Sequence, residues 1–210
     1  MILTADALAF DMDGTLIDSS PVITGAWTQW ALRRGLDHAE VVDFSHGRPL
    51  HATIARFAPD TDPGPEARWV LDLLPALEHL LRPVAGAAEL LACLRDDDWA
   101  LVTSARRDLA LRWMAVCDLP VPRVIITADN VSRAKPDPQP FARAAAHLGH
   151  APDRMIAFED SAAGLASAQA AGMPSIGIGG ATGAVASIPD YTRLGRRAGP
   201  RIILSLPGAG

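Results

Sequence analysis

The sequence predicts an α/β fold, in which a doubly wound parallel β-sheet carries an inserted α-helical cap domain. From residue 83 onward, short apolar runs alternate with amphipathic stretches, as in successive βαβ units. One further apolar run, Ala7–Phe10, stands alone near the start of the chain. The residues between these two regions are helical in pattern and interrupt the alternation after its first strand. We therefore expect an α/β core made of residues 1–19 and 83–210 and a helical cap made of residues 20–82.

The individual elements are expected in this order. The run Ala7–Phe10 predicts a buried strand that ends in a turn. In the cap, amphipathic stretches predict helices, and a break rich in Pro and Gly at residues 61–65 separates two of them. These helices are expected at residues 22–34, 49–57 and 66–81. After the cap, helices are expected at residues 87–95, 108–116, 140–148 and 162–171, and strands at residues 99–103, 124–126, 155–158 and 174–178. The C-terminal fifth of the chain has no strong assignment.

The composition is that of an ordinary globular protein, with 210 residues, 49% hydrophobic and 20% charged, and a formal net charge of −5. This acidic balance disfavours a nucleic-acid partner. Four arginines near the C-terminus are interpreted as a solvated face: Arg193, Arg196, Arg197 and Arg201. No apolar run approaches the roughly 20 residues that a membrane span needs. The N-terminus has no basic region and Asp6 interrupts it, so no signal peptide is expected.

The two cysteines, Cys93 and Cys117, have no CxxC spacing and no histidine partner. We expect both to be small buried side chains in a reducing compartment. Together with the absence of a signal peptide, this favours a cytoplasmic location.

Two aspartates follow the first predicted strand. Asp11 and Asp13 are two residues apart, so both carboxylates would point to the same side of an extended backbone, and Gly14 allows a tight turn after them. Two close carboxylates repel each other unless a cation lies between them. A calcium-binding loop also begins with spaced aspartates, but it needs glycine at its sixth position, and here glycine is the fourth.

Two candidate phosphate ligands follow later strands. The hydroxyl of Ser104 and neighbouring amides such as that of Ala105 suit phosphate oxygens, although a serine at this place is usually a helix cap. Lys135 lies in a segment that Pro136 and Pro138 stiffen, which would direct it inward; the alternative is an ordinary surface lysine.

An acidic pair, Glu159 and Asp160, follows the predicted strand at residues 155–158. Carboxylates at this place pack poorly but suit a metal ion, and a helix N-cap formed by Asp160 or Ser161 is the competing interpretation. Parallel sheets bind ligands at the carboxyl ends of their strands, so we expect this pair to lie near the two aspartates, Ser104 and Lys135.

The glycine-rich residues 177–183 superficially resemble a dinucleotide-binding loop. A true fingerprint opens a helix and has an acidic residue about 20 positions later. Asp190 comes too early for this, and we expect a strand-end loop near the rim of the site.

These motifs resemble those of the haloacid dehalogenase superfamily. They are Asp11-Met12-Asp13-Gly14-Thr15-Leu16, Ser104, Lys135 and Glu159-Asp160, and the match extends to about Ile178. Residues 44–49, 55–57 and 99–104 resemble sugar-phosphate and polyol-phosphate phosphatases, including those acting on 2-deoxyglucose 6-phosphate, glycerol phosphate and hexitol phosphates. The resemblance implies a Rossmann-like core and a Mg²⁺-dependent hydrolase of small phosphorylated metabolites.

The resemblance also implies catalytic roles. Asp11 would be the nucleophile that forms a phospho-aspartate, and Asp13 the general acid and then the general base. With a reference pKa of about 3.9, Asp11 is expected to be ionised at neutral pH. Mg²⁺ would be held by Asp11, by the backbone carbonyl of Asp13 and by Asp160, with Glu159 as an outer ligand.

Substrate contacts follow from the same resemblance. Ser104, Ala105 and Lys135 would hold the phosphoryl oxygens. In the cap, His46, Gly47 and Arg48 would face the substrate, with ordinary surface residues as the alternative for His46 and Arg48.

Two alternatives remain. β-Phosphoglucomutases share much of the pattern, but carry a histidine in the first cap helix where Ile23 stands here, which favours hydrolysis. A non-catalytic phosphate-binding module is disfavoured because Asp11, Asp13 and Lys135 are all present. The identity of the substrate and the oligomeric state do not follow from the sequence.

Overall fold

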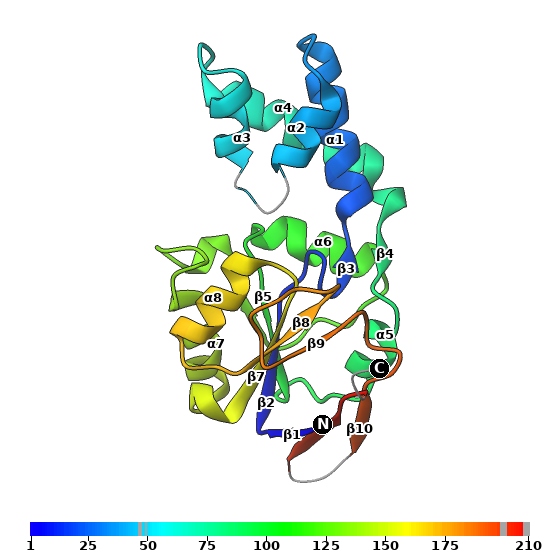
Figure 1. The fold of residues 1–210 in the computed structure, drawn as a ribbon, viewed down its shortest axis with the longest axis vertical. Coiled ribbons are helices and arrows are strands. Elements are labelled where there is room, and N and C mark those ends of the chain that lie inside the picture. The colour runs from blue at the N-terminus through cyan, green and yellow to red at the C-terminus, as the bar shows by residue number, and fades with distance from the viewer. Residues whose placement is uncertain (46–47, 49, 198–200, 208–210) are drawn as a thin grey trace. The chain divides into compact units, whose positions relative to one another are not determined.

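The structure is a computed structural model, and it describes residues 1–45, 48, 50–197 and 201–207 (Figure 1). The predicted cap residues His46 and Gly47 lie outside the described residues. The chain divides into two compact units, one made of Met1–Asp18 and Arg82–Gly210 and the other of Ser19–Leu81.

The first unit is built on a six-stranded sheet, and every neighbouring pair in it is parallel. Its order is β6-β5-β2-β7-β8-β9. The strands are β2 (Ala7–Phe10), β5 (Trp99–Val102), β6 (Val124–Ile126), β7 (Met155–Glu159), β8 (Ser175–Ile178) and β9 (Ala186–Ile188). The order starts in the middle and grows first to one side and then to the other. This is the doubly wound α/β arrangement, and the predicted fold class is confirmed.

The two faces of the sheet are packed differently because residue size alternates along the strands. On one face, small side chains such as Ala9 and Ala157 pack with Phe141 of α7 (Gln139–Leu148) in one buried cluster. On the other face the aromatic rings gather, and Phe10 stacks on Phe158 with ring centroids 4.7 Å apart. Figure 1 shows α7 and α8 (Ala162–Ala170) on one side of the sheet and α5 (Ala87–Ala92) on the other. With both faces covered, β2, β5, β7 and β8 are buried throughout, as is usual for the strands of a parallel sheet.

Helix α5 is shorter than predicted, and this corrects one expectation. It ends at Ala92, with Cys93 as its C-cap. Cys93 is exposed, contrary to the expectation that both cysteines are buried, whereas Cys117, at the C-cap of α6 (Arg107–Val116), is buried as expected.

A second sheet in the same unit was not predicted. It is antiparallel, in the order β1 (Ile2–Ala5), β11 (Ile202–Ser205), β10 (Gly195–Arg197), and so joins the two ends of the chain. Beside it, Asp6 forms ion pairs with Arg154 at 2.5 Å and with Arg201 at 3.0 Å. A further two-stranded pair, β3 (Ile17–Asp18) with β4 (Arg82–Pro83), lies where the chain leaves this unit and returns to it.

The second unit is helical in the residues that the structure describes. It contains α1 (Ser20–Arg33), α2 (His38–Ser45), α3 (Leu50–Phe57), α4 (Pro63–Leu77) and the short 3₁₀ helix η1 (Glu78–Leu80); α2 was not predicted. Glu66 is its one buried carboxylate among the described residues, and it accepts hydrogen bonds from Trp30 Nε1 at 2.6 Å and Arg34 Nη1 at 3.0 Å. Among the described residues, no helix has the length and apolar character to cross a membrane.

Candidate active site

The candidate site lies where the strand order of the main sheet reverses. Strand β2 pairs with β5 on one side and with β7 on the other, and Phe10 is in register with Phe158. The backbone N–H of Asp11 donates to the carbonyl of Phe158 at 3.0 Å. Asp11 and Glu159 therefore occupy neighbouring carboxyl ends at the switch point, which is the place where doubly wound sheets bind their ligands.

Three of the predicted acidic residues gather there. Asp11, Glu159 and Asp160 each offer a carboxylate oxygen, and these oxygens lie within 4.8 Å of one another. Gly14 makes room for the third, because a Cβ at this glycine would lie 2.0 Å from Asp160 Oδ2, and its φ of +73° also favours glycine. Asp13 is half-buried and is not one of the three.

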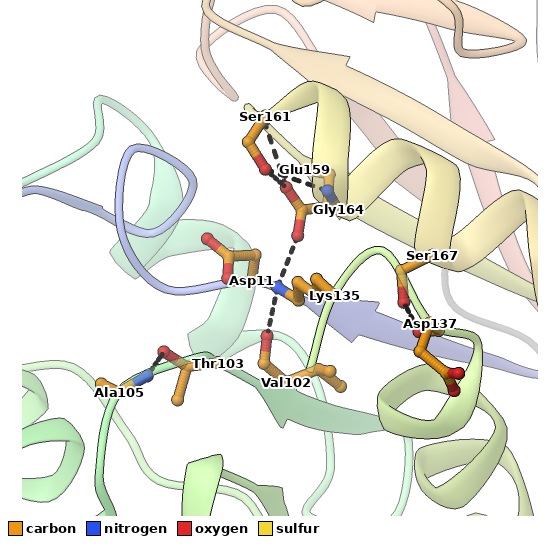
Figure 2. Close-up of polar contacts among 10 residues, drawn as sticks. All are labelled: Asp11, Val102, Thr103, Ala105, Lys135, Asp137, Glu159, Ser161, Gly164 and Ser167. Carbon is orange, nitrogen blue, oxygen red and sulfur yellow. Dashed lines mark hydrogen bonds and ion pairs between the residues drawn. The ribbon is translucent and has the colours of Figure 1, made fainter. Parts of the chain in front are cut away.

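Lys135 lies within hydrogen-bonding distance of two of these carboxylates (Figure 2). Its Nζ donates to Asp11 Oδ1 at 2.6 Å, to Glu159 Oε1 at 2.5 Å and to the backbone carbonyl of Val102 at 2.9 Å. An ammonium group has three hydrogens, so all of its donors are in use. The side chain is only 7% exposed, and the prediction that this lysine points inward agrees with its position.

Burial and neighbouring charges shift the pKa values of Asp11 and Lys135. Burial raises the pKa of Asp11 well above its ordinary value, against the opposing effect of the Lys135 ammonium, and the carboxylates of Glu159 and Asp160 raise it further. Burial would by itself lower the pKa of Lys135, but Asp11 and Glu159 outweigh it and the pKa of Lys135 ends above its ordinary value. The expectation based on a reference pKa did not include these effects on Asp11.

Glu159 is held in place by the start of helix α8. Its side chain is fully buried, and Oε2 accepts from the backbone N–H of Ser161 at 3.2 Å and from Ser161 Oγ at 2.9 Å. Ser161 Oγ in turn accepts from the N–H of Gly164 at 3.1 Å, which is the N-cap bond of the competing interpretation. A Cβ at Gly164 would lie 1.8 Å from the Glu159 carboxyl carbon. Sequence reasoning identified the cap but not the second bond of Ser161 or the fit of Gly164 against Glu159.

A family model described as haloacid dehalogenase-like hydrolase matches residues 5–172. The chain belongs to the haloacid dehalogenase-like hydrolases. This confirms the family that the motifs of the sequence indicate.

Named relatives of this hydrolase are phosphatases. It is 35% identical over 178 residues to hexitol phosphatase A of Escherichia coli, an alignment that covers 80% of this chain and 81% of the relative. It is 33% identical over 189 residues to glycerol-1-phosphate phosphohydrolase 1 of Saccharomyces cerevisiae, an alignment that covers 84% of this chain and 75% of the relative. Among solved structures, a HAD family hydrolase from Deinococcus radiodurans with bound phosphate and sodium has a TM-score of 0.71 and 26% identity, covering 89% of this chain and 92% of the other.

The other predicted substrate ligands of this hydrolase that the structure describes are Ser104, Ala105 and Arg48, and no hydrogen bond links Ser104 or Ala105 to the acidic cluster among the described residues. Ser104 is exposed after β5. The neighbouring Thr103 is buried, and its Oγ1 accepts from the N–H of Ala105 at 3.0 Å, so this amide already has a partner. Arg48, in the other unit, is exposed and donates to the carbonyl of Phe44 at 2.7 Å.

The acidic cluster fits a divalent metal ion. When Asp11, Glu159 and Asp160 are ionised and Lys135 is protonated, two negative charges are not compensated. Desolvation, and then the carboxylate of Glu159, raise the pKa of Asp160 to about 7 although this side chain remains accessible. Carboxylate oxygens are the donors that hard cations prefer, and a cation would relieve this repulsion.

Proposed function

We propose that this hydrolase cleaves phosphomonoesters of small metabolites, of the sugar- or polyol-phosphate class, with Mg²⁺ as its cofactor and Asp11 as its nucleophile. The observation that carries the proposal is the position of Asp11, which lies at the switch point of the sheet in contact with Lys135 and beside two further carboxylates. The activities of the hexitol and glycerol-1-phosphate phosphatases support the choice of substrate class.

In the first step an oxygen of Asp11 attacks phosphorus. Oδ1 accepts from Lys135, whereas Oδ2 accepts no hydrogen bond from the residues that the structure describes. As the Asp11–phosphorus bond forms, the bond to the leaving oxygen breaks and that oxygen takes a proton from Asp13. In the second step Asp13 takes a proton from water, the water oxygen bonds to phosphorus, and inorganic phosphate leaves Asp11.

A magnesium ion, when bound by Asp11, Asp160 and the backbone carbonyl of Asp13, would offset the negative charge of the phosphoryl group. Glu159 is proposed to act differently from these ligands. Both of its oxygens already accept hydrogen bonds, from Lys135 and from Ser161, so its proposed role is to hold Lys135 against Asp11.

The proposed role of Lys135 also becomes more specific. Its three donors are occupied by Asp11, Glu159 and Val102, so it holds the nucleophile before any substrate binds. It can hold a phosphoryl oxygen only by exchanging one of these contacts. The hydroxyl of Ser104 is exposed and not held in this way by the described residues, so it is the simpler ligand for the incoming phosphoryl group.

The test is release of inorganic phosphate from a panel of sugar, polyol and short-chain phosphates, with and without Mg²⁺. We expect metal-dependent release that Asp11→Asn abolishes. The matched control is Asp118→Asn, because Asp118 is an exposed aspartate of the same unit and its φ of 52° is one that asparagine tolerates. Absence of release from a folded wild-type chain across the panel, or release that Asp11→Asn leaves intact, would contradict the proposal.

A further inference from the structure

The loop that carries Lys135, residues 132–138, forms its backbone hydrogen bonds mainly within the loop and with Gln139, the first residue of α7. The side-chain carbonyl of Gln139 accepts from the N–H groups of Ser132 at 2.7 Å and Arg133 at 2.9 Å. Asp137 closes the other end of the loop, donating its N–H to the carbonyl of Ala134 at 3.0 Å and accepting from the N–H of Gln139 at 2.9 Å. Two of the seven residues of the loop are prolines, which have no N–H to donate.

Besides its bonds to the start of α7, the backbone of this loop is joined to one further element among the described residues. Ser167 Oγ, on helix α8, donates to the backbone carbonyl of Asp137 at 2.5 Å (Figure 2). In the part of the chain that the structure describes, it is the only hydrogen bond between the main chain of residues 132–138 and an element other than α7, whose Ala142 N–H donates to the carbonyl of Pro138 at 3.0 Å. Among the described residues, the other hydrogen bonds between the loop and the site are those of the Lys135 ammonium group.

The direction of the Ser167 hydroxyl is unusual for a serine inside a helix. Such a hydroxyl commonly bonds to the carbonyl three or four residues earlier in its own helix or points to solvent. Ser167 is fully buried, and its partner is 30 residues away in sequence. The N-cap of the same helix is Ser161, which holds Glu159. Helix α8 thus contacts both the carboxylate that receives Lys135 and the loop that carries it.

We propose that Ser167 is a positioning residue for Lys135. Through the carbonyl of Asp137, two residues along the chain from the lysine, its hydroxyl keeps the loop where Nζ meets its three acceptors at 2.5–2.9 Å. This inference rests on the proposed phosphatase function, because its kinetic consequence is expressed through Asp11. A displacement of about 1 Å in such a constellation can cost on the order of 100-fold in rate.

The test compares Ser167→Ala, which removes the hydroxyl, with Ser167→Thr, which keeps it and adds a methyl group in a fully buried place. On the best substrate of the wild type, Ser167→Ala should lower kcat by about tenfold with little change in KM. This is less than the loss expected for a displacement of about 1 Å, because the three bonds of Lys135 still hold the loop in part. Ser167→Thr should keep kcat near that of the wild type even if its Tm falls. A purely structural role predicts the opposite, with kcat following Tm through the series.

Hydrogen–deuterium exchange of the same proteins gives a readout that does not need activity. Ser167→Ala should speed exchange in peptides covering residues 132–138 and leave peptides of β2 and β5 unchanged. The control is Thr61→Ala, which removes a similar hydroxyl-to-carbonyl bond, to Ala58, in the helical unit. It should leave both kcat and exchange in the loop unchanged.

The two proposals fail in different ways. A wild type that hydrolyses no phosphate ester refutes the proposed function. Hydrogen–deuterium exchange in the loop still tests whether the bond from Ser167 to Asp137 holds the loop. An active wild type with equal kcat in Ser167→Ala, or with unchanged exchange in residues 132–138, refutes the role of Ser167.

Discussion

Replacing Gly164 by alanine should harm this protein, although alanine is the better helix former. Gly164 lies inside α8, where the substitution to Ala alone would stabilise by about 1 kcal/mol. A Cβ at this position, however, would lie 1.8 Å from the carboxyl carbon and from Oε1 of Glu159, and 2.1 Å from its Oε2. Side-chain atoms do not approach a Cβ closer than about 3 Å, so Glu159 must move by more than 1 Å.

The cost follows from what Glu159 holds. Its displacement breaks a buried ion pair with Lys135 and the bonds from Ser161. Removing one partner of a buried pair costs about 3–5 kcal/mol. Subtracting the helical gain leaves a loss of about 2–4 kcal/mol in the free energy of unfolding, which in a chain of this size lowers Tm by roughly 4–16 °C. Phosphatase activity should fall with it, because Lys135 loses one of its three acceptors.

The assay is thermal and urea unfolding, with phosphate release measured in parallel. Gly25→Ala is the control, since its Cβ would meet only the end of the flexible Leu77 side chain at 3.2 Å, and it should be neutral or slightly stabilising. In a Glu159→Ala background the obstruction is gone, so Gly164→Ala should there stabilise by about 1 kcal/mol. Destabilisation of the same size in both backgrounds would show that the collision with Glu159 is not the cause.

Three further predictions concern stability. Glu66→Gln removes the carboxylate charge that accepts hydrogen bonds from Trp30 and Arg34. It should lower the free energy of unfolding by about 1.5–3 kcal/mol in urea titrations. The hydrogen bond from Arg154 lowers the pKa of Asp6 in the folded protein. The stabilisation of the fold by the ionised Asp6 is therefore fully present above pH 3.8, and it is lost as the pH falls through the lowered pKa of the folded state. The Tm difference between wild type and Asp6→Asn should accordingly be widest above pH 4 and shrink in stronger acid; a constant difference would contradict this. Adding Mg²⁺ at about 100 times its Kd should stabilise the wild type by about 2.7 kcal/mol, chelation should reverse this, and Asp160→Asn should reduce the shift.

The central strands could be predicted because their apolar runs admit few other structures. β2, β5 and β7 are buried on both faces and flanked by turns, and their predicted bounds agree with the structure to within one residue. The carboxyl-end positions of Asp11 and Glu159 then follow from the parallel topology. Helix α2 was missed because its eight residues bury only Val41 and Ser45, which is too little for a recognisable apolar face.

Features that depend on distant partners could not be predicted. Strand β11 exists because it pairs with β1 and β10, and the first of these pairings joins the two ends of the chain. The raised pKa of Asp11 results from burial and from carboxylates that only the fold brings together. Ser167 carries no signal in the sequence, because a serine in a helical stretch is read as a surface residue until its partner is known.

The most direct test of the account is detection of the phosphoryl group on Asp11. Asp13→Asn, mixed with p-nitrophenyl phosphate and Mg²⁺, should still be phosphorylated, because this leaving group needs no proton from Asp13, but it should turn over slowly because water then lacks its general base. We expect a burst of one p-nitrophenol per chain, and rapid quenching followed by mass spectrometry should find one phosphoryl group on the peptide that contains Asp11. A burst with the phosphoryl group on another residue, or steady release without any covalent adduct, would contradict the central claim.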